Sequence, residues 1–304
     1  MSAALPATPR TPGSPSSRRT GPVRAALRII ADVADFRLRR LEMANLAGAA
    51  AVGIAVGLAL PELAGRLAFG ALLNLLVYLN NDFLDVDADL ASTTRAPEMT
   101  RFLAAHRGSA IGAQLGLLGL LVAIALLWIP ALLVPLLAGG GLCWAYSARL
   151  KKIAGLDVAA MIAWGVAMTL VGAPLQSPLA WALVLQLGLF SGVFESIQVL
   201  RDRPEDLAVG VRTTAVILGE VGTGRLIRIM LLVSAAYGTL LIHPVAGLLP
   251  IVALGLPITR ASIPAYWTRI RLLLGLTFLA EITWVSVHGH TSGLWLTISA
   301  GQVT

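Results

Sequence analysis

Long apolar segments alternate with short polar connections over most of the chain. Between about residues 43 and 290, the apolar runs approach the roughly 20 residues that an α-helix needs to cross a bilayer. This pattern predicts an all-α integral membrane protein, with residues 43–290 as a transmembrane domain of about nine helices. The expected spans are residues 43–60, 62–80, 108–128, 130–146, 155–174, 178–199, 223–242, 244–259 and 272–288.

The segments that flank this domain have different patterns. Residues 1–22 are rich in Pro, Ser, Thr and Arg without periodicity, which predicts a disordered tail. In residues 23–42, apolar positions recur near a 3.6-residue period between arginines at both ends. This predicts an amphipathic helix on the membrane surface, with a soluble partner-binding helix as the alternative. Residues 291–304 are expected to form a short C-terminal tail.

Composition supports a membrane protein and excludes several other classes. The chain is 57% hydrophobic and only 13% charged, whereas a soluble domain usually carries about 25% charged residues. Its one cysteine, Cys143, cannot form an intramolecular disulfide, and no Cys/His spacing typical of a zinc site is present.

The distribution of positive charge predicts how the chain lies in the membrane. If the expected spans simply alternate, all of the 23 Lys and Arg residues except Arg66 fall on the same side. The positive-inside rule then places the N-terminus and these loops in the cytoplasm and the C-terminus outside the cell membrane. The net charge of +7 therefore indicates membrane orientation, and we expect no nucleic-acid partner.

A dense acidic stretch, NDFLDVDAD at residues 81–89, ends the second expected span and is called the first acidic motif. On a continuing helix, spacings of three and four residues place its main oxygen donors on one face. Such hard ligands suit Mg²⁺, which takes one or two carboxylates and completes its shell with water and substrate phosphates. A solvated helix end is the alternative, but charge that directly follows an apolar span is costly and usually functional. The predicted metal ligands here are Asn81, Asp82, Asp85 and Asp89.

A second acidic motif, Asp202 to Asp206, follows the sixth expected span. Its two aspartates are four residues apart with arginines interleaved. Carboxylates for a metal and guanidinium groups for phosphate oxygens are what a Mg²⁺–diphosphate site requires. Pro204 predicts that the helix ends or kinks at Arg203. Alone this would be an ordinary charged loop, but together with the first motif it is a candidate second half-site.

Further polar residues lie between the two motifs or inside the spans. The segment YSARLKK, residues 146–152, either contributes positive charge to a diphosphate pocket or simply anchors the chain on the cytoplasmic side of the membrane. Asn74 and Gln198 are candidates to line a substrate pocket, with hydrogen bonding between helices as the alternative. Glu195 and Glu281 mark an interior cavity or a hydrogen-bonded helix pair, or they carry ions in a transporter.

Together these motifs resemble the UbiA superfamily of intramembrane prenyltransferases. Residues 81–89 fit the family's NDxxDxxxD motif, YSARLKK is similar to its YSxxLK stretch, and residues 202–216 fit DxxxD followed by Gly and Thr. The resemblance covers about residues 40–290. It implies a UbiA-like bundle of about nine helices around a central apolar cavity.

The resemblance also implies a reaction and residue roles. A polyprenyl diphosphate ionises with the help of Mg²⁺, and an aromatic or other lipophilic acceptor attacks the allylic cation. An intramembrane terpene cyclase that needs no acceptor is the alternative. The implied catalytic residues are Asp82, Asp85, Asp202 and Asp206. The implied metal ligands are these four together with Asn81 and Asp89. The implied diphosphate-binding residues are Asn81, Tyr146, Arg149, Lys151 and Arg203.

Overall fold

The computed structural model describes residues 21–40, 42–43, 45–91, 97–259 and 262–292. In these ranges the secondary structure is helical, and the one β-type contact is an isolated parallel bridge between Ile153 and Arg212. The predicted tail at 1–22 lies almost wholly outside the described residues, as does most of the tail predicted at 291–304.

The helices follow one another with short connections. The α-helices are α1 (Pro22–Arg39), α2 (Asn45–Ala55), α3 (Leu60–Ala91), α4 (Pro97–Ala105), α5 (Arg107–Leu127), α6 (Leu133–Ala148), α7 (Leu156–Thr169), α8 (Pro178–Ala208), α9 (Thr214–Tyr237), α10 (Leu248–Leu254) and α11 (Ile263–Ser292). Three short 3₁₀ segments are η1 (Pro130–Leu132), η2 (Leu150–Lys152) and η3 (Leu170–Gly172), and η4 (Gly238–Ile242) is a π-helix.

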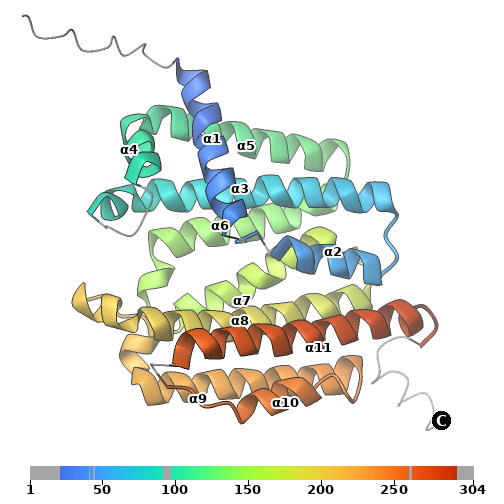
Figure 1. The fold of residues 1–304 in the computed structure, drawn as a ribbon. Coiled ribbons are helices and arrows are strands. Elements are labelled where there is room, and N and C mark those ends of the chain that lie inside the picture. The colour runs from blue at the N-terminus through green and yellow to red at the C-terminus, as the bar shows by residue number, and fades with distance from the viewer. Residues whose placement is uncertain (1–20, 41, 44, 92–96, 260–261, 293–304) are drawn as a thin grey trace, which may run out of the picture.

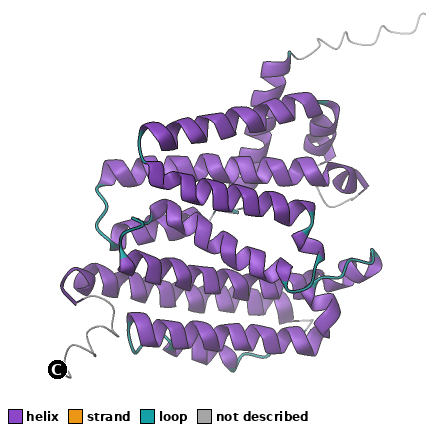
Figure 2. Ribbon diagram, turned by 180° about the vertical axis from the view of Figure 1, so that it is seen from behind, coloured by secondary structure: helices purple, strands orange, loops and turns teal. Residues whose placement is uncertain are grey.

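The long helices lie side by side as a bundle, and α1 runs across it. Figure 1 shows α1 crossing α5 and α3, and these helices pack against one another. Seen from behind, the connections gather at the two ends of the long helices (Figure 2). Of the six candidate spans, α8 is the most enclosed. In its apolar 18-residue stretch 67% of the residues are buried, against 28% in α5. The bundle therefore has a core around α8 and apolar outer faces suited to lipid.

The count of nine spans is not confirmed. Among the described residues, six helices are long and apolar enough to cross a membrane. These six are Leu60–Leu90, Arg107–Leu127, Pro130–Ala148, Pro178–Ala208, Thr214–Ile242 and Ile263–His288. The other three expected spans correspond to the short apolar helices α2, α7 with η3, and α10.

Two of the three short helices, α2 and α7, end early for local reasons that hydropathy does not reveal. The α2 helix stops before Gly57, which adopts a φ of 75° that ends a right-handed helix, and it spans only about 16 Å. Beyond α7 the chain tightens into η3 and reaches extended backbone at Ala173, just before Pro174. An apolar run thus predicts burial or lipid contact, but it does not fix the length of the helix.

The predicted end or kink at Arg203 was wrong as to the end of the helix. The α8 helix continues to Ala208 with Pro204 inside it. A proline ring has a helix-compatible φ, but it removes the hydrogen bond to the carbonyl four residues earlier and crowds that carbonyl, which disturbs the helix locally without ending it here. Asp202 and Asp206 therefore lie on one continuous helix, one turn apart.

The α1 helix forms where the apolar period predicted it. Its buried face consists of Ala25, Ile29, Val33 and Arg37, which are spaced four residues apart and pack on α3, α4 and α5. Val23 and Leu27 on the outer face are exposed. A location of α1 on the membrane surface remains a prediction.

Candidate functional site

The two acidic motifs lie at the same end of the bundle. Figure 1 shows the C-terminal ends of α3 and α8 and the α6–α7 connection at one end, opposite the C-terminal end of α11. This arrangement follows from the antiparallel order of the helices, because α3, α6 and α8 all run toward this end. Three segments far apart in the sequence therefore end at the same end of the bundle.

One side of the first acidic motif faces α6 and η2. The Ser147 hydroxyl donates a hydrogen bond to the Asn81 side-chain oxygen at 2.9 Å. The Lys151 ammonium donates to both carboxylate oxygens of Asp85, at 2.6 and 2.7 Å. The structure thus brings Asn81, Asp85 and Lys151 together, as their proposed shared role requires.

The other side of this motif faces α1. The Arg37 guanidinium forms ion pairs with Asp82 and Glu42, and its carbon lies 4.5 Å from the centre of the Tyr78 ring. Burial alone would lower the pKa of Arg37, but the Asp82 and Glu42 carboxylates raise it above its ordinary value. Arg37 therefore stays charged and balances the buried Asp82 carboxylate.

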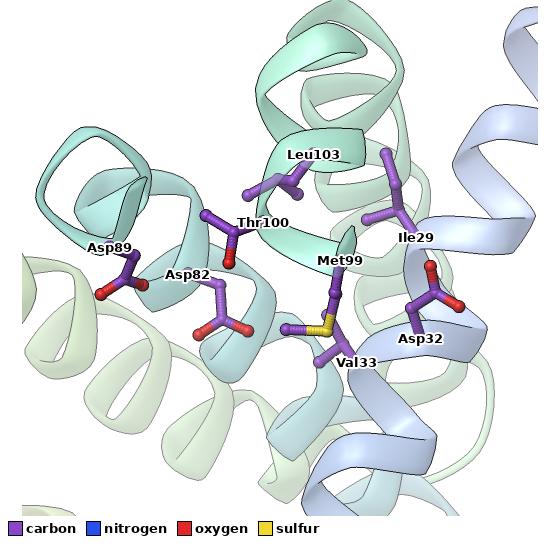
Figure 3. A pocket seen from close by; sticks show the side chains of 8 residues that line it. All are labelled: Ile29, Asp32, Val33, Asp82, Asp89, Met99, Thr100 and Leu103. Atoms are coloured by element: carbon purple, nitrogen blue, oxygen red, sulfur yellow. The ribbon is translucent and has the colours of Figure 1, made fainter. Parts of the chain in front are cut away.

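Asp82 and Asp89 also border a small pocket between three helices. Figure 3 shows Asp82 beside Thr100 and Met99 of α4, with Asp89 farther along α3 and with Ile29, Asp32 and Val33 of α1 on the opposite side of the pocket. The lining residues are Ile29, Asp32, Val33, Asp82, Asp89, Met99, Thr100 and Leu103. The predicted single face is therefore divided, because neighbouring residues such as Asn81 and Asp82 point about 100° apart around a helix.

The second acidic motif is held by its own neighbours. Arg201 donates to both carboxylate oxygens of Asp202, at 2.7 and 3.0 Å. The Thr213 hydroxyl donates to Asp206 at 3.0 Å. Arg203 donates to the Ala215 carbonyl oxygen at 3.1 Å and so faces the first turn of α9, and its binding of diphosphate stays a prediction.

The remaining predicted residues are placed as follows. The Tyr146 hydroxyl donates to Glu195 of α8 at 3.0 Å, inside the bundle, whereas Arg149 is exposed. Asn74 is fully buried in a reciprocal amide pair with Asn45, which joins α3 to α2. This contact matches the alternative of hydrogen bonding between helices, and a pocket role for Asn74 or for the half-buried Gln198 stays a prediction.

Among the residues near the motifs that the sequence did not predict are Arg37, Ser147 and Asp157. For Arg37 a signal was present, since an arginine interrupts the apolar face of an amphipathic helix at the four-residue spacing. Ser147 lies inside the YSARLKK segment and carried no separate signal. Asp157 is an acid at the start of an apolar run, and such a residue is costly to bury unless it has partners.

The donor set fits Mg²⁺ bound together with a substrate. Carboxylate and amide oxygens are the ligands that Mg²⁺ accepts, and it needs only one or two carboxylates when phosphates supply the others. Within the described ranges, no group of three acids, histidines or cysteines is positioned to hold a metal by protein ligands alone. Asp85 and Asp202 each bind a cationic side chain through both oxygens, so both carboxylates are oriented to accept positive charge.

Comparison with known proteins gives a sequence-level match over most of the chain. Residues 43–273 match the model of the UbiA prenyltransferase family. A curated relative is the 4-hydroxybenzoate octaprenyltransferase of Saccharophagus degradans, which is 28% identical over 148 residues. The aligned part is 46% of this chain and 48% of that protein, so the chain spans about half the length of this relative.

Solved structures share the fold at low sequence identity. A digeranylgeranylglyceryl phosphate synthase superposes with a TM-score of 0.67 at 12% identity, covering 86% of this chain and 99% of that one. A UbiA homologue from Archaeoglobus fulgidus, bound to GPP and Mg²⁺, superposes with a TM-score of 0.58 at 15% identity. There the match covers 86% of this chain and 98% of the other.

Proposed function

The chain belongs to the UbiA prenyltransferase family, and from this premise we propose that it transfers a prenyl group from a polyprenyl diphosphate to an aromatic or other lipophilic acceptor. Family membership confirms the resemblance seen in the sequence motifs. The substrate class is supported by a relative named for octaprenyl transfer to 4-hydroxybenzoate and by a structural neighbour bound to GPP and Mg²⁺.

One observation carries the proposal: the two acidic motifs lie at one end of the bundle, and each has a carboxylate with both oxygens bound to a cationic group. Lys151 holds Asp85, and Arg201 holds Asp202. Two acidic half-sites with nearby cations suit a doubly charged leaving group held through divalent metal. A charged loop that only anchors the protein would not need carboxylates from two helices at one place.

The proposed roles follow from these positions. Asn81 and Asp85 hold one side of the metal–diphosphate group, and Asp202 and Asp206 hold the other. Mg²⁺, when bound, neutralises the phosphate oxygens and stabilises the charge that develops on the leaving group. Lys151 adds a donor to the same leaving group once Asp85 is engaged elsewhere, a form of electrostatic stabilisation in place before the reaction.

The chemistry requires that the allylic carbon–oxygen bond break with its electron pair leaving on diphosphate. A nucleophilic atom of the acceptor then bonds to the allylic carbon and loses its proton. The apolar side chains of the bundle exclude water, which would otherwise capture the cation. A central apolar cavity for the isoprenoid chain is part of this proposal.

The proposal also includes an orientation. The protein is a multi-pass membrane protein, and the concentration of Arg and Lys at the end that carries both motifs favours a cytoplasmic location for that end. In this arrangement Mg²⁺ enters from the cytoplasm and diphosphate is released into it, while both lipophilic substrates enter from the bilayer.

The experiment is a product assay with purified protein, Mg²⁺ and labelled geranyl, farnesyl or geranylgeranyl diphosphate, with and without aromatic acceptors. Acceptor-dependent formation of a prenylated product is the expected result. Formation of a hydrocarbon or terpene alcohol at the same rate without acceptor would contradict prenyl transfer and support cyclisation. If no diphosphate is released under any condition, the enzyme function is contradicted and an ion-coupled transporter becomes the better hypothesis.

A further inference from the structure

Asp157 is a buried carboxylate that belongs to neither acidic motif. It lies in the first turn of α7 and is only 1% exposed. Its oxygens accept hydrogen bonds from the Val158 N–H at 2.9 Å, from the Thr214 N–H at 2.7 Å, and from the Thr214 hydroxyl. Burial of a charged carboxylate costs free energy unless hydrogen bonds compensate it, so the position and partners of Asp157 call for an explanation.

The partners of Asp157 are the first N–H groups of two different helices. Val158 belongs to the start of α7, and Thr214 is the first residue of α9. Helix N-termini have unpaired N–H groups and a partial positive charge, which a carboxylate stabilises. An ordinary capping residue serves one helix, whereas this carboxylate joins two helices that are separated in the chain by the whole of α8.

The two connections that Asp157 joins each hold one acidic motif. The connection before α7 contains Lys151, which binds Asp85 of the first motif. The connection before α9 contains Thr213, which binds Asp206 of the second motif. Each connection therefore has one end on a motif and the other end at Asp157.

Additional hydrogen bonds link the same two connections. The Gly155 N–H donates to the Thr214 hydroxyl oxygen at 2.7 Å, and Ile153 forms a parallel bridge with Arg212. Gly155 and Gly210 have φ values of 83° and 72°, which favour glycine and allow each connection to turn tightly toward the other.

We propose that Asp157 is a positioning residue that fixes the distance between the two acidic motifs by joining the connections that hold them. The inference rests on the proposed function, because it assumes that the motifs bind one Mg²⁺–diphosphate group. Residues that orient a metal ligand without touching the metal commonly change metal affinity about 10–100-fold when they are replaced.

The test uses three variants: Asp157→Asn, Thr214→Val and Thr214→Ser. Asp157→Asn removes the negative charge and places an amide N–H group where a carboxylate oxygen accepts a hydrogen bond. Each full-length variant is assayed for the Mg²⁺ concentration at half-maximal rate, for KM and kcat with a prenyl diphosphate, and for thermal unfolding. We expect this Mg²⁺ concentration to rise about 10–100-fold in Asp157→Asn and less in Thr214→Val. Thr214→Ser keeps the hydroxyl and should behave as wild type.

A matched control is Thr277→Val, because Thr277 is buried but its hydroxyl bonds only within its own helix, to the Leu273 carbonyl oxygen. It should leave the Mg²⁺ requirement unchanged even if it lowers stability. If Asp157→Asn does not fold, the Mg²⁺ requirements of Thr214→Val and Thr277→Val are compared. The inference then requires that only Thr214→Val raise the Mg²⁺ requirement. Folded variants with the wild-type Mg²⁺ requirement would overturn the inference, whereas wild-type protein without Mg²⁺-dependent turnover would contradict the proposed function itself.

Discussion

At the scale of single residues, the first acidic motif depends on an arginine from a helix outside the predicted transmembrane domain. The side chains of Arg37 and Asp82 are 7% and 5% exposed, so both charges are removed from water. The Tyr78 hydroxyl, which donates to the Glu42 backbone oxygen at 2.6 Å, helps to hold the end of α1 at this place. Arg37 thus connects α1 to the motif.

Replacing Arg37 by Met should destabilise the protein strongly. The substitution breaks a buried ion pair by removing one of its partners, which typically costs about 3–5 kcal/mol. Denaturant unfolding in detergent should show this decrease in the free energy of unfolding. The control Arg39→Met removes an exposed ion pair with Asp35 and should cost less than about 1 kcal/mol. Equal effects of the two substitutions would contradict the assignment of a buried ion pair.

Replacing Lys151 by Met should impair catalysis more than binding. Lys151 is positioned at Asp85, and loss of one preorganised donor to a developing charge commonly lowers kcat by about 10²–10³-fold. Steady-state kinetics with a prenyl diphosphate measures this effect. Lys152→Met removes the same charge from the exposed neighbour and should stay near wild type. Equal losses in both variants would instead favour general anchoring by positive charge.

The spacings in the sequence pointed to the pairs within each motif because helix geometry is local, although a break at Arg203 was expected in the second motif. Spacings of four residues place Asn81 near Asp85 and Asp202 near Asp206 on any continuous helix. The residues that contact these motifs from other helices are far away in the sequence. Arg37 and Asp82 are 45 residues apart, and Ser147 and Asn81 are 66 residues apart. No local rule relates residues so distant, so these contacts appear only in the folded structure.

At the scale of elements, the short helix α2 approaches the end of α7 closely because of a glycine. A Cβ atom added at Gly172 would lie 1.9 Å from the Ala49 carbonyl oxygen. Gly172 therefore allows the backbones of η3 and α2 to touch. The reciprocal amide pair of Asn45 and Asn74 fixes the neighbouring α2–α3 contact.

Gly172→Ala should separate these two elements. A methyl group at this point must displace the backbone of α2, and overpacking of this kind costs about 1–3 kcal/mol. Thermal unfolding in detergent should show the loss. Gly112→Ala in α5 is the matched control, because nothing lies within 4 Å of the new methyl group. That control should be neutral or stabilising by up to about 1 kcal/mol, and a stable Gly172→Ala variant would contradict the close approach.

Hydropathy located every apolar segment but gave the wrong lengths for several. Each of the nine predicted segments overlaps a helix, yet only six of these helices are long enough to be candidate spans within the described residues. Gly57 ends α2, and a 3₁₀ turn precedes Pro174 after α7, so single backbone features shorten runs that composition alone treats as continuous.

At the scale of the whole molecule, the helix order brings two remote motifs to one end of a bundle. The α6–α7 connection contacts the first motif through Lys151. At the start of α7, Asp157 binds Thr214, whose neighbour Thr213 binds Asp206 of the second motif. An all-helical bundle with both motifs at one end was predictable from apolar spans and charge, although the count of nine spans is not confirmed. The UbiA family was predictable from the motifs. The physical link between the motifs was not, because it depends on hydrogen bonds between loops.

The measurement that tests a single shared site most directly is Mg²⁺-dependent diphosphate release by Asp85→Ala, Asp202→Ala and the double variant. Residues that act together on one step give non-additive losses, so the double variant should be about as slow as the slower single variant. Losses that multiply in the double variant, or either single variant with the wild-type rate, would show that the two acidic motifs do not hold one Mg²⁺–diphosphate group.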